Sequence, residues 1–216
     1  MAWSIYFIEK FAAFFLFVIL WFQIVFAEIM QIERFDIEGP LLLTVDIFRD
    51  ERGCFFETFN QDKYAEFGIP IEKFVQDNES ESAANVLRGL HFQTPPFAQG
   101  KLVRVAAGRV MDVAVDIRSS SPTFGQHIAV ELSSENKKQL WIPVGFAHGF
   151  VTLEEGVIFS YKVTAPYSKD CDGGIFWNDP ALEIKWPIAE PVVSENDNCL
   201  PTLEEYLKNP KFYMKK

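Results

Sequence analysis

The chain has 216 residues, a length typical of one domain or of one domain with an appendage. Hydrophobic residues make up 49% and charged residues 23%, which is enough apolar surface to build a core and excludes wholesale disorder. The formal net charge of −10 argues against a general nucleic-acid binder, because phosphate backbones are bound by clustered Lys and Arg. Three widely spaced cysteines predict free thiols in a reducing compartment rather than a disulfide scaffold.

The N-terminus contains an uncharged apolar run from Phe11 to Ala27, directly after Glu9 and Lys10. Three interpretations stay open: a dispensable segment that arises from the choice of start site, a membrane anchor, or the core of a signal peptide. The net-positive stretch before the apolar run and the clear cleavage site that are typical of a signal peptide are absent. We expect residues 1–29 to be an extension outside the domain and residues 30–216 to form the domain. The expected location is cytoplasmic, with membrane contact only if residues 11–27 form a real anchor.

The rest of the chain has the pattern of a β protein. Apolar and other residues alternate with a period of two in Val110–Ile117, His127–Leu132 and Val157–Val163, which predicts strands. The first of these is expected to be half-buried. Turn signals separate strands at intervals of roughly 8–12 residues, which is typical of a sandwich or barrel. Helices are expected only in short pieces, at Gln61–Phe67 and Leu203–Leu207.

Polar side chains on apolar strand faces are the first functional candidates. Lys101 shares a face with Val103 and Val105, and Tyr161 shares one with Phe159, so both point into the barrel if the alternation holds. A buried lysine is rare unless it is paired or functional. The competing interpretations are a lysine stem at the surface and a structural tyrosine.

Two of the three histidines, His91 and His148, lie among polar residues and glycines. Each of them, taken alone, is more often a structural histidine than a functional one. The sequence contains no His-x-His pair, no Gly-rich phosphate loop and no G-x-S-x-G motif. Neither a metal ion nor another cofactor is therefore predicted.

Several long motifs follow one another along the chain. They are FVQDNESESAANVLRGLHFQ at 74–93, DVAVDIR at 112–118, QLWIPVGFAHGF at 139–150 and WNDP at 177–180. Together they closely resemble the dTDP-4-dehydrorhamnose 3,5-epimerase family, and the resemblance covers about residues 30–200. It implies an all-β fold, a cupin-type jelly-roll β-barrel with short peripheral helices. It also implies a homodimer that needs no metal.

The resemblance implies roles for individual residues. His91, in the RGLHFQ motif, corresponds to the catalytic base, Asp197 to its dyad partner, and Tyr161 to the acid on the opposite face of the sugar. Lys101 corresponds to a lysine near the substrate, and Tyr167 to an aromatic residue that stacks on the thymine. The other implied substrate contacts are Arg52, Glu57, Gln76, Asn78, Arg88, His148, Asp172 and Asn196.

Three residues depart from the family pattern. Cys54 replaces an apolar or aromatic residue in the segment DERGCFFE, and Asp172 stands where a glutamate is frequent. Asn196 stands where a lysine often precedes the dyad aspartate, which removes a positive charge near the expected diphosphate. None of the three changes affects His91, Lys101, Tyr161 or Asp197.

The implied reaction inverts C3 and C5 of dTDP-4-dehydro-6-deoxy-D-glucose during dTDP-L-rhamnose synthesis. The 4-keto group acidifies the protons on both carbons, and a neutral imidazole near pH 7 is a well-matched base for them. Lys101 would stabilise the enolate oxygen, and Arg52 and Arg88 would pair with the diphosphate. Two other interpretations stay open: an epimerase that acts on only one of the two carbons, and a sugar-nucleotide-binding module without catalysis.

Overall fold

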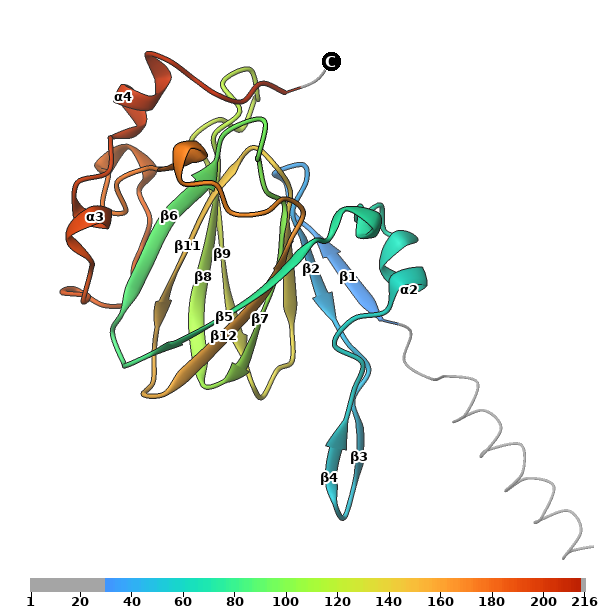
Figure 1. Cartoon of the computed structure of the whole chain (residues 1–216). Coiled ribbons are helices and arrows are strands. Elements are labelled where there is room, and N and C mark those ends of the chain that lie inside the picture. The colour runs from blue at the N-terminus through green and yellow to red at the C-terminus, as the bar shows by residue number, and fades with distance from the viewer. Residues whose placement is uncertain (1–29, 215–216) are drawn as a thin grey trace, which may run out of the picture.

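The computed structural model describes residues 30–214, which form two packed antiparallel sheets (Figure 1). The first sheet runs from edge to edge through β1 (Gln31–Arg34), β2 (Leu41–Thr44), β10 (Gln139–Ile142), β7 (Lys101–Ala107), β12 (Val157–Val163) and β5 (Gln76–Ser82). The second sheet runs through β13 (Asp172–Gly174), β6 (Leu87–Gln93), β11 (Phe146–Thr152), β8 (Arg109–Asp116) and β9 (His127–Ser133). The predicted all-β jelly-roll architecture is confirmed.

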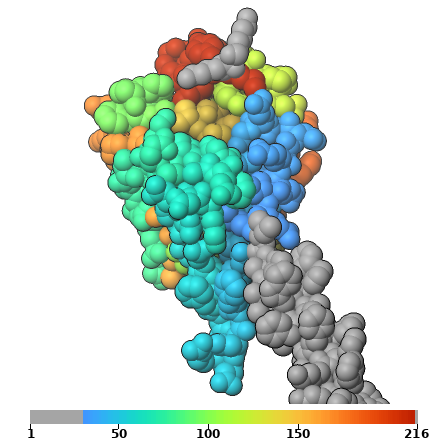
Figure 2. Space-filling model, turned by 90° about the vertical axis from the view of Figure 1, so that its right-hand side faces the viewer, coloured from blue at the N-terminus to red at the C-terminus, as the bar shows by residue number. Residues whose placement is uncertain are grey.

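A separate hairpin of β3 (Phe48–Asp50) and β4 (Gly53–Phe55) projects from the body (Figures 1 and 2). Short helices lie at the periphery: α2 (Gln61–Ala65), η1 (Ile71–Lys73), η2 (Lys169–Cys171), η3 (Pro180–Leu182), α3 (Glu195–Asn198) and α4 (Leu203–Leu207). The helix Leu203–Leu207 has the predicted bounds, whereas α2 ends two residues earlier than predicted. The apolar segment within residues 1–29 lies outside the described residues. Among residues 30–214, no helix is long and apolar enough to cross a membrane.

The main core fills the space between the two sheets. Val103 and Phe159 of the first sheet pack there with Val110, Ala114 and Phe150 of the second. The outer face of each sheet is covered by a smaller cluster, one under α2 and one under the C-terminal segment. Both sheets are therefore buried on both faces over much of their area, and each further side chain that points between them enters an apolar surrounding.

The prediction of a half-buried strand at Val110–Ile117 is wrong, because the strand found there, β8, is buried on both faces. Val113 and Val115 belong to the cluster formed with Tyr206 of the C-terminal segment. Asp112 lies on the opposite face, toward the space between the sheets, and is fully buried. The residues that cover the outer face are distant in the sequence, so the local alternation contains no sign of them.

The strands that carry His91 and His148 approach each other closely at two glycines. A Cβ added to Gly89 would lie 2.6 Å from the Cα of Gly149, so a larger residue does not fit without displacing the backbone. Gly89 also has a φ of +124°, a conformation that other residues rarely adopt. His91 and His148 are partners in the register of β6 and β11. The glycine contact therefore helps to fix the relative position of both histidines.

The segment that carries Asp197 is fixed to the start of β6. The backbone N–H of Leu87 donates to the carbonyl of Val192 at 2.9 Å, and the N–H of Val192 donates to the carbonyl of Asn85 at 2.7 Å. The helix α3 follows, and the Ser194 hydroxyl at its N-cap accepts from the backbone N–H of Asp197 at 3.1 Å. These bonds direct the Asp197 carboxylate back toward the strand.

Candidate active site

A cavity of about 480 Å³ is lined by β5, β6, β7, β11, β12, the segment before α3 and α3 itself. A second cavity of about 250 Å³ adjoins it, because His91, Lys101 and Tyr161 line both. We call them the large lobe and the small lobe of the site. The large lobe contains six of the predicted site residues: Arg88, His91, Lys101, His148, Tyr161 and Asp197. The small lobe adds four more: Gln76, Asn78, Tyr167 and Asp172.

His91 and Asp197 form a hydrogen-bonded pair at the wall of the large lobe. The distance between Nε2 of His91 and Oδ1 of Asp197 is 2.9 Å, and Oδ2 of Asp197 accepts from the backbone N–H of Gly89 at 3.1 Å. Burial alone would raise the pKa of Asp197, but the hydrogen bonds from His91, Gly89 and Ser194 outweigh it and lower that pKa below its ordinary value. Asp197 is therefore ionised near pH 7.

The ionised carboxylate fixes the tautomer of His91. A carboxylate only accepts hydrogen bonds, so the neutral imidazole must carry its proton on Nε2, the atom that faces Asp197. The other ring nitrogen, Nδ1, is then left with a free lone pair. The side chain of His91 is 39% exposed and lines both lobes. The pair thus has the chemistry of a general base that can exchange protons with solvent.

A second histidine–aspartate pair lies deeper in the same cavity. Nε2 of His148 lies 2.9 and 3.1 Å from the two carboxylate oxygens of Asp112. Burial lowers the pKa of His148, and Asp112 only partly offsets this effect, so the ring is neutral near pH 7. Asp112 was missed from the sequence because the strand was expected to be half-buried. Its hydrogen bond to His148 joins residues that are 36 positions apart in the sequence, so no local pattern indicates it.

Lys101 supplies a positive charge at the junction of the lobes. Its Nζ lies 3.5 Å from the carbonyl oxygen of His91. Burial lowers the pKa of Lys101 to about 8, and the nearby charges of Asp112 and Asp172 limit the shift. The ammonium is therefore mostly protonated near pH 7 and can stabilise a negative charge that develops on a ligand.

Tyr161 faces the cavity from the sheet opposite to His91. Tyr161 belongs to β12 of the first sheet and His91 to β6 of the second, and both line both lobes. Burial raises the pKa of Tyr161, although the charge of Arg88 acts in the other direction. The phenol keeps its proton near pH 7, so it can act as a proton donor. The predicted inward direction of Lys101 and Tyr161 is confirmed.

The small lobe combines amide groups with an exposed aromatic ring. Nε2 of Gln76 donates to Oδ1 of Asn78 at 2.7 Å, and the backbone N–H of Tyr167 donates to Oε1 of Gln76 at 3.3 Å. The hydroxyl of Tyr167 lies 3.5 Å from Oδ2 of Asp172, and the residue is 60% exposed. A planar ligand group could stack on this ring while its polar edge meets the amides.

Three predicted contacts do not line either lobe of their own chain. Arg52 lies at the turn of the β3–β4 hairpin, where it pairs with Asp50. Glu57 pairs with Lys63 of α2. Asn196 is exposed on α3, next to Asp197, with its side chain outside the lining of the large lobe. The roles assigned to these three residues by resemblance stay predictions.

Comparison with known proteins identifies the family. Residues 34–205 match the family model described as dTDP-4-dehydrorhamnose 3,5-epimerase. The enzyme of that name from Salmonella typhimurium is 55% identical over 172 residues, which cover 79% of this chain and 94% of that protein. The crystal structure of dTDP-6-deoxy-D-glucose-3,5-epimerase from Legionella pneumophila, in complex with dTDP-4-keto-L-rhamnose, is 45% identical with a TM-score of 0.82, and the match covers 87% of this chain and 100% of that one.

A more distant relative is named for a narrower activity. It is a 3′-monoepimerase from Streptomyces bikiniensis, solved in complex with dTDP-quinovose, with 27% identity and a TM-score of 0.79 over 84% of this chain and 92% of that one. The fold and these matches put the chain in the class of cupin-like sugar-nucleotide epimerases. Within that class, the chain belongs to the dTDP-4-dehydrorhamnose 3,5-epimerase family, as the resemblance predicted.

The lowered pKa of Lys101 is directly measurable. In protein with ¹³C-labelled lysine side chains, one Cε signal should titrate with a midpoint near pH 8, because Lys101 is charged below that pH and neutral above it. The signal should vanish in Lys101→Met. It should remain in the control Lys162→Met, which removes a lysine that pairs with Asp77. Titration of every lysine at its ordinary value, about 10, would refute the burial of this ammonium.

Proposed function

We propose that this chain inverts C3 and C5 of dTDP-4-dehydro-6-deoxy-D-glucose to give dTDP-4-dehydro-L-rhamnose. One observation carries the proposal: the His91–Asp197 pair and Tyr161 line one cavity from opposing sheets, with Lys101 between the lobes. Epimerisation needs a base on one face of the sugar and an acid on the other. The family match and the 55% identity to the Salmonella typhimurium epimerase support the same reaction.

The proposed chemistry starts with the ketone. Nδ1 of His91 removes the proton from a carbon next to the 4-keto group, and the electrons of the broken C–H bond form an enolate whose oxygen carries the negative charge. The Lys101 ammonium stabilises that oxygen, and preorganised stabilisation of this kind is worth several kcal/mol, on the order of 10²-fold or more in rate. Asp197 stabilises the imidazolium that forms on His91.

Inversion is completed from the opposite side. Tyr161 gives its hydroxyl proton to the same carbon, and the enolate electrons form the new C–H bond. His91 then carries one extra proton and Tyr161 has lost one, so exchange with water returns both groups to their starting states. Repetition of this cycle at the second carbon gives the doubly inverted product. No electron donor or acceptor is consumed, since the reaction is an isomerisation.

The small lobe is the proposed nucleotide end of the site. Tyr167 would stack on the thymine, a contact worth roughly 1–3 kcal/mol by analogy with base stacking on aromatic side chains. Gln76 and Asn78 would contact polar groups of the nucleotide, with Asp172 beside Tyr167. Arg88 and His148 would contact the part of the ligand in the large lobe.

An epimerase that inverts only one carbon is the second candidate. The observation in its favour is the similarity to the 3′-monoepimerase of Streptomyces bikiniensis. One solved form of that protein is a double mutant with a histidine and a tyrosine replaced, and these two positions are as far apart in its chain as His91 and Tyr161 are here. The same base and acid would thus serve one or two inversions.

Isotope exchange tests the reaction. We expect incubation with the 4-keto sugar nucleotide in deuterated water to place deuterium at both C3 and C5, read by NMR and mass spectrometry against a sample without protein. His91→Asn should slow the labelling by about 10²- to 10⁴-fold, the usual contribution of a general base. A matched control is Lys162→Ala, next to Tyr161 but paired with Asp77, which should label normally.

Two results would contradict the proposed double inversion. Label at one carbon only would select the one-carbon epimerase. Binding of the nucleotide sugar by the wild-type protein without any label would select a binding module without catalysis.

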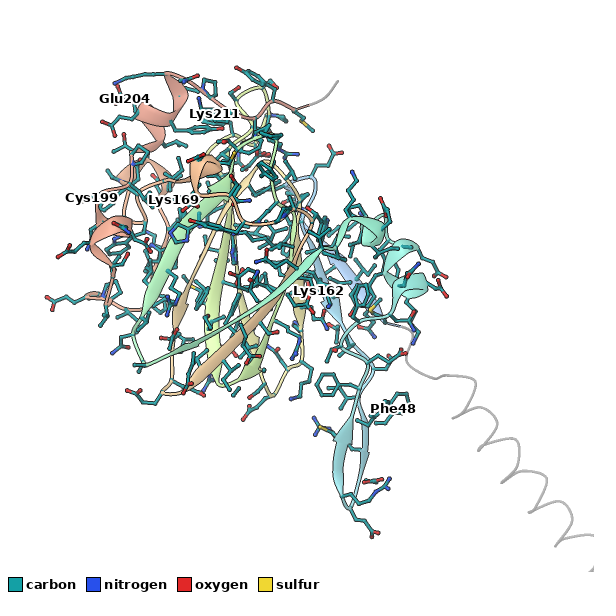
Figure 3. The ribbon with its side chains drawn as sticks, viewed as in Figure 1. Phe48, Lys162, Lys169, Cys199, Glu204 and Lys211 are labelled. Carbon is teal, nitrogen blue, oxygen red and sulfur yellow. The ribbon has the colours of Figure 1, made fainter. Side chains whose placement is uncertain are left out.

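We further propose that Arg52 and Glu57 act in a homodimer, on the cavity of the partner chain. The β3–β4 hairpin, which carries Phe48, stands apart from the barrel (Figure 3). Its Phe48 and Phe55 are 58% and 69% exposed. A two-stranded hairpin is marginal in water by itself, and exposed aromatic pairs favour burial against another surface. In a symmetric dimer, Arg52 would contact a diphosphate in the cavity of the partner chain, whereas it does not line the cavity of its own chain.

Complementation tests this assignment. We expect His91→Ala and Arg52→Ala to be weakly active as separate proteins and to recover activity when unfolded and refolded together. In a mixed dimer one site would combine an intact His91 with an intact Arg52, so random pairing should restore about a quarter of the wild-type rate. Mixed dimers that form without any gain in activity would show that each hairpin serves its own chain or none.

The proposed location of the reaction is the cytoplasm. The cysteines Cys54, Cys171 and Cys199 are all unpaired, which suits a reducing compartment. Fractionation of cells that express the chain from Met1 or from Met30 tests this. Both proteins should remain in the soluble fraction, and recovery of the Met1 form with membranes would assign an anchor to residues 11–27.

A further inference from the structure

The inner face of β5 carries a continuous polar stripe. Because side chains alternate along a strand, Gln76, Asn78, Ser80 and Ser82 share one face, while Asp77, Glu79 and Glu81 share the other and are exposed. Gln76 and Asn78 line the small lobe, and Ser80 lines the large lobe. The stripe thus runs from the proposed nucleotide end of the site toward the large lobe, where the proposed proton transfer takes place. Neither the sequence motifs nor the proposed reaction assigns Ser80 a role.

Ser80 differs from its neighbours in having no hydrogen-bond partner. Gln76 and Asn78 bond to each other, and the Ser82 hydroxyl accepts from Nε of Arg88 at 3.2 Å. The Ser80 hydroxyl is shielded from solvent and unpaired, the only such side-chain polar atom among the non-exposed residues of 30–214. Unpaired buried polar atoms are rare in folded proteins, since each loses its bond to water without replacement. This one lies on a cavity wall.

The surroundings of Ser80 indicate what would pair with it. Ser80 is the register partner of Phe159 on β12, and Phe150 and Val86 line the same lobe. These side chains offer no hydrogen bond to a ligand. A sugar hydroxyl that enters this part of the lobe needs a polar partner, and a turn of the serine side chain to another staggered rotamer supplies one.

We propose that the Ser80 hydroxyl hydrogen-bonds to a ring hydroxyl of the hexose and thereby positions the sugar between His91 and Tyr161. The contact is to the sugar and not to the nucleotide, because Ser80 lines the large lobe while Tyr167 and Asp172 line the small one. This inference rests on the proposed function and deepens it. Ser80 is a binding residue with no part in proton transfer.

The test compares Ser80→Ala with Ser160→Ala, which removes a hydroxyl from the opposite face of the neighbouring strand. Ser80→Ala should lower kcat/KM for the 4-keto sugar nucleotide by roughly three- to tenfold, the range for one neutral hydrogen bond. Its affinity for dTDP alone, measured by calorimetry, should be unchanged. Its melting temperature should be equal or higher, because an unpaired buried oxygen is removed. Ser160→Ala should match the wild type in kcat/KM and dTDP affinity.

Unchanged kcat/KM in Ser80→Ala would overturn the inference, as would a parallel loss of dTDP affinity, which would mark a nucleotide contact. A lowered melting temperature with a proportional loss of both would mark a structural role and also overturn it. Wild-type turnover is the separate check on the proposed function. If the wild type binds the sugar nucleotide without turnover, the proposed epimerase function is wrong. The role of Ser80 is then decided by comparing the sugar-nucleotide affinity of Ser80→Ala with that of the wild type.

Discussion

The bond between Nε2 of His91 and Oδ1 of Asp197 is the interaction on which the site depends. It joins a strand in the middle of the chain to a helix near its end, 106 positions later. The second carboxylate oxygen holds the backbone of Gly89, so one side chain fixes both the imidazole and the strand that carries it. The close contact of Gly89 with Gly149 sets where that strand lies against β11. Without the bond, the ring would lose both its tautomer and its direction.

The charges of the cavity are arranged around this pair. Each of the two carboxylates beside the large lobe is hydrogen-bonded to a histidine, Asp197 to His91 and Asp112 to His148. Lys101 and Arg88 are the cationic residues in the lining of that lobe. A neutral histidine does not cancel the charge of the carboxylate that it binds, so Lys101 and Arg88 are the groups that attract an anionic ligand to this cavity of a protein with a net charge of −10.

Much of the fold follows from local patterns. The alternation at Val157–Val163 predicted the strand with its observed bounds, and the shared faces of Lys101 and Tyr161 predicted that both enter the space between the sheets. The covering of β8 could not be predicted in this way. Its outer face is buried by residues near the C-terminus, and the local sequence of neither segment indicates that the two pack together.

The site was predictable only in part for the same reason. Alternation identified Lys101 and Tyr161, but the partnership of His91 with Asp197 came from resemblance, since no spacing rule links residues so far apart. Asp112 was missed because a charged residue on an alternating strand is usually solvated. Ser80 was missed because an unpaired hydroxyl is a property of packing. Arg52 does not line the cavity of its own chain, and its local sequence carries no sign of this.

The most direct test of this account is the ¹⁵N NMR spectrum of His91 in ¹⁵N-histidine protein, assigned by its loss in His91→Asn. In the neutral ring, the account predicts a protonated Nε2 and an unprotonated Nδ1, with the proton shared between the two nitrogens in Asp197→Asn. An unprotonated Nε2 in the wild-type protein would contradict the account, because the carboxylate of Asp197 could not then hold the ring with its basic nitrogen free.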